Sequence, residues 1–301
     1  MNVSVKIKLL ILPVALCAVL ACYSDVFAIS KIGKKRAVVA LDEAVAFLEA
    51  NDFDKALEKI DESLKIYPRF ARAHVVMGKV FYRKGNTVRA LVEFEKAIEL
   101  DPSEDRAYWE RGQVYYDTRD YKRAVADFGS VIEHNNKDYK AFYHRGLAYM
   151  KLGNVSLAVK DFEFSLKIDD EYAESHFGLA VIYKKRGSKD QEDYHRGKAS
   201  EFFNKRGREY LEIGDYKSAI SAFKSAIRAN EKDSQGYYNI AAVEAAQGKA
   251  ESFCKKLSIA VRKGFEDWDL VYEDKAIDKI RGEHCFSAIV DAGILKSKNR
   301  R

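Results

Sequence analysis

The sequence predicts an all-helical protein built as a solenoid of antiparallel helix pairs. Two observations lead to this prediction. A pattern of small, aromatic and apolar residues returns every 34 residues along most of the chain. The chain of 301 residues also contains only three prolines, and 33% of its residues are charged, as expected for helices with a wet outer face. One helix pair cannot bury its apolar side alone, so the pairs are expected to stack on one another.

The pattern consists of a few positions that recur at fixed spacing. A small residue comes first, as Ala44, Gly78, Gly112, Gly146 and Ala180, and after one shorter step as Gly207 and Ala241. An aromatic residue follows three positions later on the same helix face, as Phe47, Phe81, Tyr115, Tyr149, Tyr183 and Tyr210. The second helix carries an alanine and, four residues on, a large apolar residue: Ala56 and Ile60, Ala90 and Phe94, Ala124 and Phe128, Ala158 and Phe162, Ala219 and Phe223. We expect the small residue to let the paired helices approach closely.

A tight turn is expected between the two helices of each pair. The turn position is Gly85 in the clearest repeat, and its equivalents are Asn51, Arg119, Gly153, Gly187, Gly214 and Gly248. Glycine readily adopts the left-handed backbone conformation that ends a helix. Pro68 and Pro102 are expected to stop the second helices of the first two repeats, because proline cannot continue a helix.

This pattern, in about seven copies over roughly residues 37 to 263, resembles the tetratricopeptide repeat family. The resemblance implies a right-handed superhelix in which the first helices of the pairs line an inner, concave face. It also implies a C-terminal helical cap after the last repeat, and a protein that binds other proteins.

The first residues have the layout of a secretory signal peptide. Lys6 and Lys8 precede an apolar run from residue 9 to residue 21, and Val26-Phe27-Ala28 places compact residues where a signal peptidase reads. We expect cleavage after Ala28. Two alternatives stay open: an uncleaved membrane anchor, and a lipoprotein that is lipidated at Cys22. These are the two ways in which the sequence predicts a membrane association.

The repeat register breaks once. The step from Ala180 to Gly207 is 27 residues, and the segment between Gly187 and Ala199 is polar and lacks the apolar pattern. This predicts either a short or missing second helix or a polar N-terminal extension of the next helix. In both cases we expect a joint between two stacks that bends and that proteases cut first. The predicted parts are a signal peptide (1–28), a basic linker (29–36), repeats one to five (37–187), the joint (188–199), repeats six and seven (200–263), the cap (264–295) and a disordered basic tail (296–301).

Composition and motifs exclude several function classes. The net charge of +6 is mild, whereas a nucleic-acid-binding protein usually shows a clustered basic stripe. The six histidines have no metal-ligand spacing, and no phosphate-binding loop or nucleophile motif is present, so we expect neither an enzyme nor a cofactor. Beyond the signal peptide, Cys254 and Cys285 remain; they either pair or stay as two buried thiols, and we favour the thiols.

The resemblance also indicates which residues face the concave side. In repeats two to five the corresponding positions carry basic and aromatic side chains, the types that dominate binding hot spots. The candidate peptide-binding residues are Lys79, Tyr82, Arg83, Arg106, Trp109, Gln113, Tyr116, Lys140, Tyr143, Leu147, Lys151, Phe177 and Lys184. The rings would floor a groove, and Lys79, Arg83, Lys151 and Lys184 would form a basic rim.

These observations predict an exported scaffold or adaptor, in the periplasm or outside the cell, that takes part in assembly of the cell envelope. The expected partner is a protein or peptide segment that is acidic and carries apolar anchors. No nucleic acid is expected as a partner. The alternative is a glycan-binding or cell-wall-binding module, because rings such as Trp109 and Tyr82 also stack on sugars.

Overall fold

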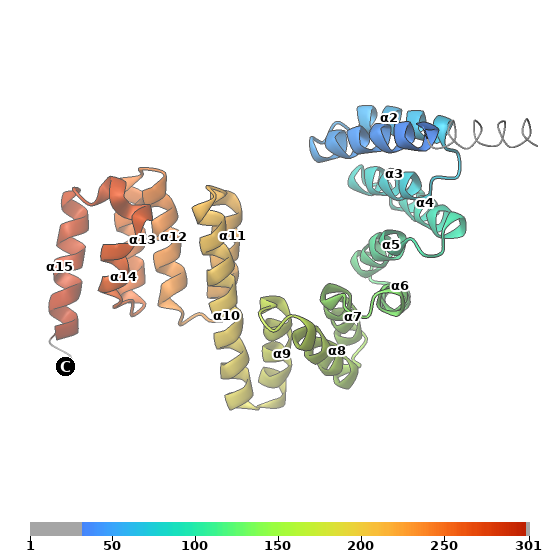
Figure 1. The fold of residues 1–301 in the computed structure, drawn as a ribbon. Helices are drawn as coiled ribbons and strands as arrows, with labels where there is room; N and C mark the ends of the chain where they lie inside the picture. The colour runs from blue at the N-terminus through green and yellow to red at the C-terminus, as the bar shows by residue number, and fades with distance from the viewer. Residues whose placement is uncertain (1–31, 299–301) are drawn as a thin grey trace, which may run out of the picture. The chain divides into compact units, whose positions relative to one another are not determined.

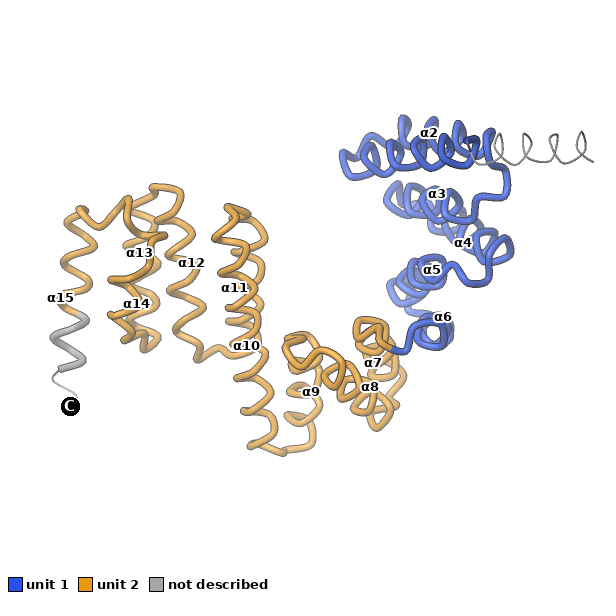
Figure 2. Tube along the Cα trace, in the orientation of Figure 1, with its two compact units in different colours: residues 1–136 blue, residues 137–301 orange. Residues whose placement is uncertain are grey.

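The computed structural model describes residues 32–298, and this part of the chain is made of helices and turns without a strand (Figure 1). The predicted signal peptide, its cleavage site and Cys22 lie outside the described residues, as do residues 29–31 of the predicted linker. No helix within residues 32–298 is long and apolar enough to cross a membrane. The chain forms two compact units, one up to Asn136 and one from Lys137 onwards (Figure 2), and each is described by itself.

The first unit contains three helix pairs. A helix over residues 32–49 pairs with α2 (Phe53–Ile66), and the next pairs are α3 (Ala71–Arg83) with α4 (Thr87–Leu100) and α5 (Asp105–Asp117) with α6 (Tyr121–His134). Side chains at Asp52, Asn86 and Asp120 cap the second helices by accepting a hydrogen bond from the backbone three residues on.

The first helix begins earlier than expected. Residues 32–36, which the sequence placed in a linker, already belong to it. Ala37 and Leu41 are fully buried, and the Ser63 hydroxyl of α2 donates a 2.7 Å hydrogen bond to the Ala37 carbonyl. The apolar face therefore starts directly after the basic run, and the helix extends back through it.

The second unit continues the pairing and ends in a cap. Its helices are α7 (Tyr139–Lys151), α8 (Val155–Ile168), α9 (Ala173–Arg186), α10 (Lys189–Glu212), α11 (Tyr216–Ala229), α12 (Ser234–Ala246), α13 (Ala250–Arg262), α14 (Trp268–Glu273), the 3-10 helix η1 (Lys275–Ile280) and α15 (His284–Lys298). Antiparallel neighbours pack along the chain, and α15 packs on α13. Residues 296–298 of the predicted tail belong to α15.

The predicted turns and helix crossings are confirmed. Every predicted turn residue has a positive φ, including the two that are not glycine, Asn51 (φ 60°) and Arg119 (φ 66°). A Cβ atom built on Gly78 would come within 2.5 Å of the Phe94 ring, so the paired helices do meet at this glycine. The large apolar residues of the pattern are 0–1% exposed: Ile60, Phe94, Phe128, Phe162 and Phe223.

The segment that was expected to be a joint is part of one long helix. Of the two alternatives, the structure has the polar N-terminal extension: α10 runs without interruption from Lys189 to Glu212. It packs on both α9 and α11, and so serves as the second helix of the fifth repeat and as the first helix of the sixth. Glu192 and His195 are buried against these neighbours. The apolar periodicity alone therefore did not show that this polar segment is a packed helix. The two compact units divide after residue 136.

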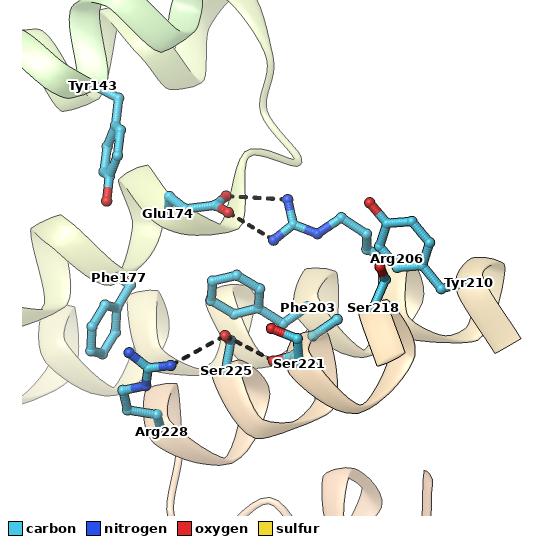
Figure 3. Close-up of a pocket in the computed structure, with 11 residues that line it drawn as sticks. Tyr143, Glu174, Phe177, Phe203, Arg206, Tyr210, Ser218, Ser221, Ser225 and Arg228 are labelled. Atoms are coloured by element: carbon cyan, nitrogen blue, oxygen red, sulfur yellow. Dashed lines mark hydrogen bonds and ion pairs between the residues drawn. The ribbon is translucent and has the colours of Figure 1, made fainter. Parts of the chain in front are cut away.

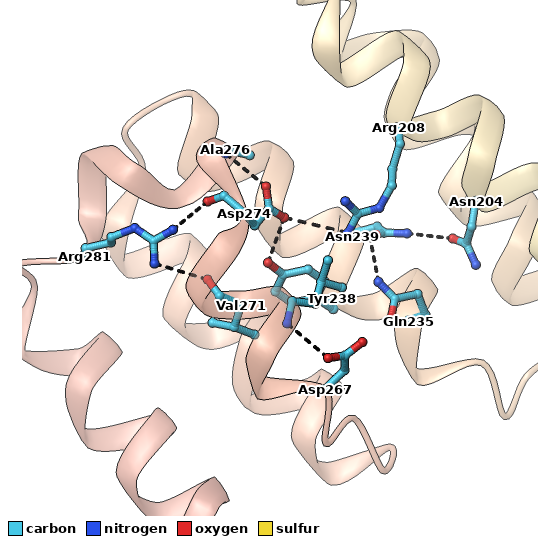
Figure 4. A network of polar contacts seen from close by, with 11 residues as sticks. Asn204, Arg208, Gln235, Tyr238, Asn239, Asp267, Val271, Asp274, Ala276 and Arg281 are labelled. Carbon is cyan, nitrogen blue, oxygen red and sulfur yellow. Dashed lines mark hydrogen bonds and ion pairs between the residues drawn. The ribbon is translucent and has the colours of Figure 1, made fainter.

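The C-terminal cap is fixed by apolar packing, a polar network and a disulfide. The Phe265 ring stacks on Tyr238 with 4.5 Å between centroids, and the Tyr238 hydroxyl donates a 2.8 Å hydrogen bond to Asp274 (Figure 4). A disulfide joins Cys254 of α13 to Cys285 of α15, with 6.1 Å between the Cα atoms. The favoured expectation of two free thiols is therefore wrong, because packing of α15 on α13 brings the two cysteines together.

Candidate functional site

In the first unit, the basic side chains of the predicted rim form ion pairs and hydrogen bonds with neighbouring repeats. Lys79 forms a 2.9 Å ion pair with Glu110 of α5. Arg83 donates 2.8 Å hydrogen bonds to the Leu48 carbonyl and to the Asn51 side chain of the preceding pair. These contacts bind one repeat to the next. Arg106 is exposed.

The predicted rings of the first unit are partly buried and have partners of their own. The Tyr82 hydroxyl donates a 2.6 Å hydrogen bond to Asp117, and burial together with this carboxylate raises the pKa of Tyr82 to about 12. Trp109 meets the core ring of Phe128 edge-on, with 5.6 Å between centroids. Tyr116 and Gln113 are also partly buried. Tyr82 thus joins two neighbouring repeats, whereas Trp109 packs within its own repeat.

In the second unit, two predicted residues come together in a hollow and the others lie apart from it. Tyr143 of α7 and Phe177 of α9 both line a pocket of about 430 Å³. Lys140 lines a neighbouring hollow with Tyr172 and Lys205. Leu147 packs in the core cluster around Phe162. Lys151 and Lys184 are exposed and line neither hollow.

The pocket is built by three helices with α7 above them. Helix α9 supplies Glu174 and Phe177, α10 supplies Phe203, Arg206 and Tyr210, and α11 supplies Ser218, Ser221, Ala222, Ser225 and Arg228 (Figure 3). A small apolar cluster beneath it, with Ala199, Phe203 and Ala226 at its centre, holds the three helices together. The pocket therefore has a rigid apolar base and a polar wall.

The two arginines of the pocket differ in their surroundings. Arg206 forms a two-pronged ion pair with Glu174, with the shorter contact at 2.7 Å. Burial opposes the charge of Arg206, but Glu174 outweighs it and raises the pKa of the guanidinium. Arg228 is exposed, and its hydrogen bond is a 3.5 Å contact to the Ser225 hydroxyl. Within residues 32–298 no carboxylate lies within ion-pair distance of Arg228.

No group of three or more potential metal ligands exists in the part of the chain that the structure describes. His176 and His195 are buried, with their Nδ1 atoms 2.9 Å apart, and the Nε2 of His176 lies 3.1 Å from the Asp170 carbonyl. His74 is likewise buried, as expected of core histidines, and lies 2.8 Å from Glu93.

Comparison with protein-family models identifies the repeats. Residues 78–119 match a model described as TPR repeat, and residues 110–172 and 204–264 match one described as tetratricopeptide repeat. The chain belongs to the tetratricopeptide repeat family. The gap between the matched segments contains the first half of α10, where the repeat register is lost. Members of the family generally serve as protein–protein interaction scaffolds.

Solved structures resemble this chain in fold. MamA from Desulfovibrio magneticus RS-1 (residues 41 to the end) has a TM-score of 0.50 at 21% identity, covering 56% of this chain and 94% of its own. A tetratricopeptide repeat protein from Parabacteroides merdae ATCC 43184 has a TM-score of 0.49 at 18% identity, covering 81% and 98%. No curated protein matches the sequence. At these identities the likeness concerns the fold alone.

Sequence reasoning missed the wall that α11 contributes. Only the first helices of the repeats were expected to line the binding side. A signal was nevertheless present, because Ser218, Ser221, Ser225 and Arg228 follow helical spacing on one face of α11. Together with the shortened repeat just before them, this hydroxyl-rich face indicates an exposed polar surface.

Proposed function

We propose that this protein is an exported scaffold that binds a peptide segment of a partner protein in the pocket between α9 and α11. The observation that carries the proposal is the pocket itself, which combines aromatic rings, serine hydroxyls and an arginine, Arg228, with no carboxylate partner among residues 32–298. Pockets that recognise ligands combine apolar surface with polar groups that fix the orientation of the ligand. Arginine and tyrosine are among the residues that contribute most to binding at protein interfaces.

The disulfide supports export of the chain. Disulfides persist in oxidising compartments such as the periplasm and the extracellular space, and they are rare in the cytosol. The pairing of Cys254 with Cys285 agrees with the signal-peptide layout of the first 28 residues. We propose that the mature chain begins at Ile29 and acts in assembly of the cell envelope. N-terminal sequencing of protein from its native host tests this; a start at a lipidated Cys22, or an intact Met1, would contradict cleavage after Ala28.

The binding function is tested with peptides, using the chain from residue 29 to residue 301. A positional-scanning library of nonapeptides is screened against the purified protein, and the selected peptides are titrated against Phe177→Ala and Trp109→Ala variants. We expect Phe177→Ala to weaken binding about tenfold or more, because it removes a ring from the pocket. Trp109 lies in the first unit, so Trp109→Ala should leave binding unchanged. A library that yields no binding peptide, with an envelope oligosaccharide bound instead, would overturn the proposal in favour of a glycan-binding module.

A further inference from the structure

The pocket exists because the chain has no break within α10. Elsewhere in the second unit a loop of four residues separates one helix pair from the next, at residues 169–172 and 230–233. No such loop is present between the fifth and sixth repeats, where seven residues are missing from the 34-residue period and α10 is continuous. As a result α9 and α11 both pack on α10, and both contribute side chains to the pocket.

The α11 wall presents hydrogen-bond donors in a row. Ser218, Ser221 and Ser225 lie at helical spacing, and Arg228 follows at the C-terminal end of the same face. Among these, the Ser225 hydroxyl donates to the Ser221 carbonyl within the helix and accepts from Arg228. Figure 3 shows the Arg228 guanidinium beside the Phe177 ring at one end of the pocket.

The charge of the pocket favours an anionic ligand group. Glu174 already neutralises Arg206, and the two are held together by two hydrogen bonds. Arg228 is exposed and has no carboxylate within ion-pair distance among residues 32–298, so these residues leave its positive charge in the pocket uncompensated. A planar guanidinium binds a carboxylate through two parallel hydrogen bonds, which matches a single Asp or Glu side chain.

Next to Arg228, the same pocket also offers an apolar surface. Phe177 is partly buried, and Phe203 forms the base at 6% exposure. Tyr143 of α7 covers this region, with its ring packed edge-on against Tyr172 at 5.3 Å. An aliphatic or aromatic side chain that enters here would be removed from water on several sides, which supplies affinity.

We propose that the α9–α11 pocket recognises a peptide segment in which an acidic side chain pairs with Arg228 and a nearby apolar side chain packs on Phe177. This inference rests on the proposed function, and it names the chemistry of the partner at that site. It places acid recognition on α11, a second helix, rather than on the lysines and arginines of the first helices.

The test uses the nonapeptide library with acetylated and amidated ends, so that the carboxylates present are those of side chains. We expect selection of Asp or Glu a few residues from an apolar side chain. The best peptide and its Asp→Asn or Glu→Gln counterpart are then titrated against wild type, Arg228→Gln and Lys224→Gln. Lys224 is the matched control, because it is an exposed cation on α11 that does not line the pocket. Thermal melts establish that each variant is folded.

We expect the affinity for the peptide to fall about tenfold, relative to wild type with the acidic peptide, when either Arg228 or the peptide acid is neutralised. The affinity should fall no further when both are neutralised. Lys224→Gln should bind as wild type does. Two results would show that the inference is wrong while the peptide-binding function stands. In one, the affinity losses from Arg228→Gln and from the neutral peptide multiply when combined. In the other, neutral peptides are selected as often as acidic ones. If no peptide binds, both fall. An anionic oligosaccharide that binds through Arg228 would also overturn the inference.

Discussion

Single glycines set how closely the paired helices approach. A Cβ atom on Gly146 or on Gly178 would come within 2.8 Å of the Phe162 ring, so this ring is clamped between two glycines of successive first helices. Overpacking a close helix crossing forces side chains or backbone to shift. The small-residue position of the repeat is therefore a packing requirement.

We predict opposite effects of one substitution at two glycines. Gly78→Ala should lower the free energy of unfolding by about 1–3 kcal/mol, because its new Cβ would come within 2.5 Å of Phe94. Gly197→Ala should raise it by about 0.5–1 kcal/mol, because this exposed glycine lies inside α10 and a Cβ there would meet no described atom within 4 Å. Chemical denaturation measures both. A stabilising Gly78→Ala would show that the crossing is looser than the structure has it.

The buried histidine pair predicts how stability depends on pH. Burial and the proximity of His176 lower the pKa of His195 to about 4, and burial lowers the pKa of His176 as well. Charged groups around the pair include Asp170, Lys198 and Glu201. In the window between about 4 and 6.5, the unfolded chain binds protons that the folded chain does not. Stability is therefore present above pH 6.5 and is lost as the pH falls towards 4.

We expect His195 to contribute about 1–2 kcal/mol to a loss of stability between pH 7 and pH 5. Denaturation curves at both values for wild type and His195→Gln measure this contribution, since the glutamine does not titrate. The variant should show the smaller loss. Equal losses in the two proteins would mean that His195 titrates alike in the folded and unfolded chains.

At the scale of the element, α10 is the feature that the sequence predicted least well. The 34-residue period predicted each turn residue, even Asn51 and Arg119, because the chain must reverse at the same place in every repeat. The period left two alternatives for this segment, a short or missing second helix or a polar extension of the next helix. Lys189–Ala199 has almost no apolar residue to show which face is buried. Polar contacts hold it instead: Arg196 donates 2.8 Å and 2.6 Å hydrogen bonds to Glu192 and to the Ala229 carbonyl that ends α11.

We predict that α10 behaves as one stable helix. Backbone amides from Glu192 to Phe203 should exchange with deuterium as slowly as those of α9 and α11, because this stretch is packed between both. Hydrogen exchange followed by mass spectrometry resolves these segments. The exposed turn at Gly187 serves as an internal reference for fast exchange. Rapid exchange in residues 192–199 would restore the flexible joint that the periodicity suggested.

At the scale of the whole molecule, the repeat predicted the class of fold but not the position of the pocket. Lys79, Arg83 and Tyr82 were candidates for ligand binding, yet in the structure they join neighbouring repeats. A single sequence cannot separate these two roles, because both place polar side chains on the same helix face. Arg228 was missed because the pocket wall of α11 arises from the continuous α10 helix.

Site-specific photo-crosslinking tests whether the α9–α11 pocket holds the partner's peptide. A photoreactive phenylalanine analogue is placed at Ser221 in the pocket wall, at Lys224 of α11, which does not line the pocket, or at Arg106 in the first unit. The selected acidic nonapeptide is added before irradiation. Mass spectrometry then locates each cross-link. We predict cross-links from position 221 and none from positions 224 and 106. Cross-links from position 106 without any from 221 would contradict the account and place binding on the first unit.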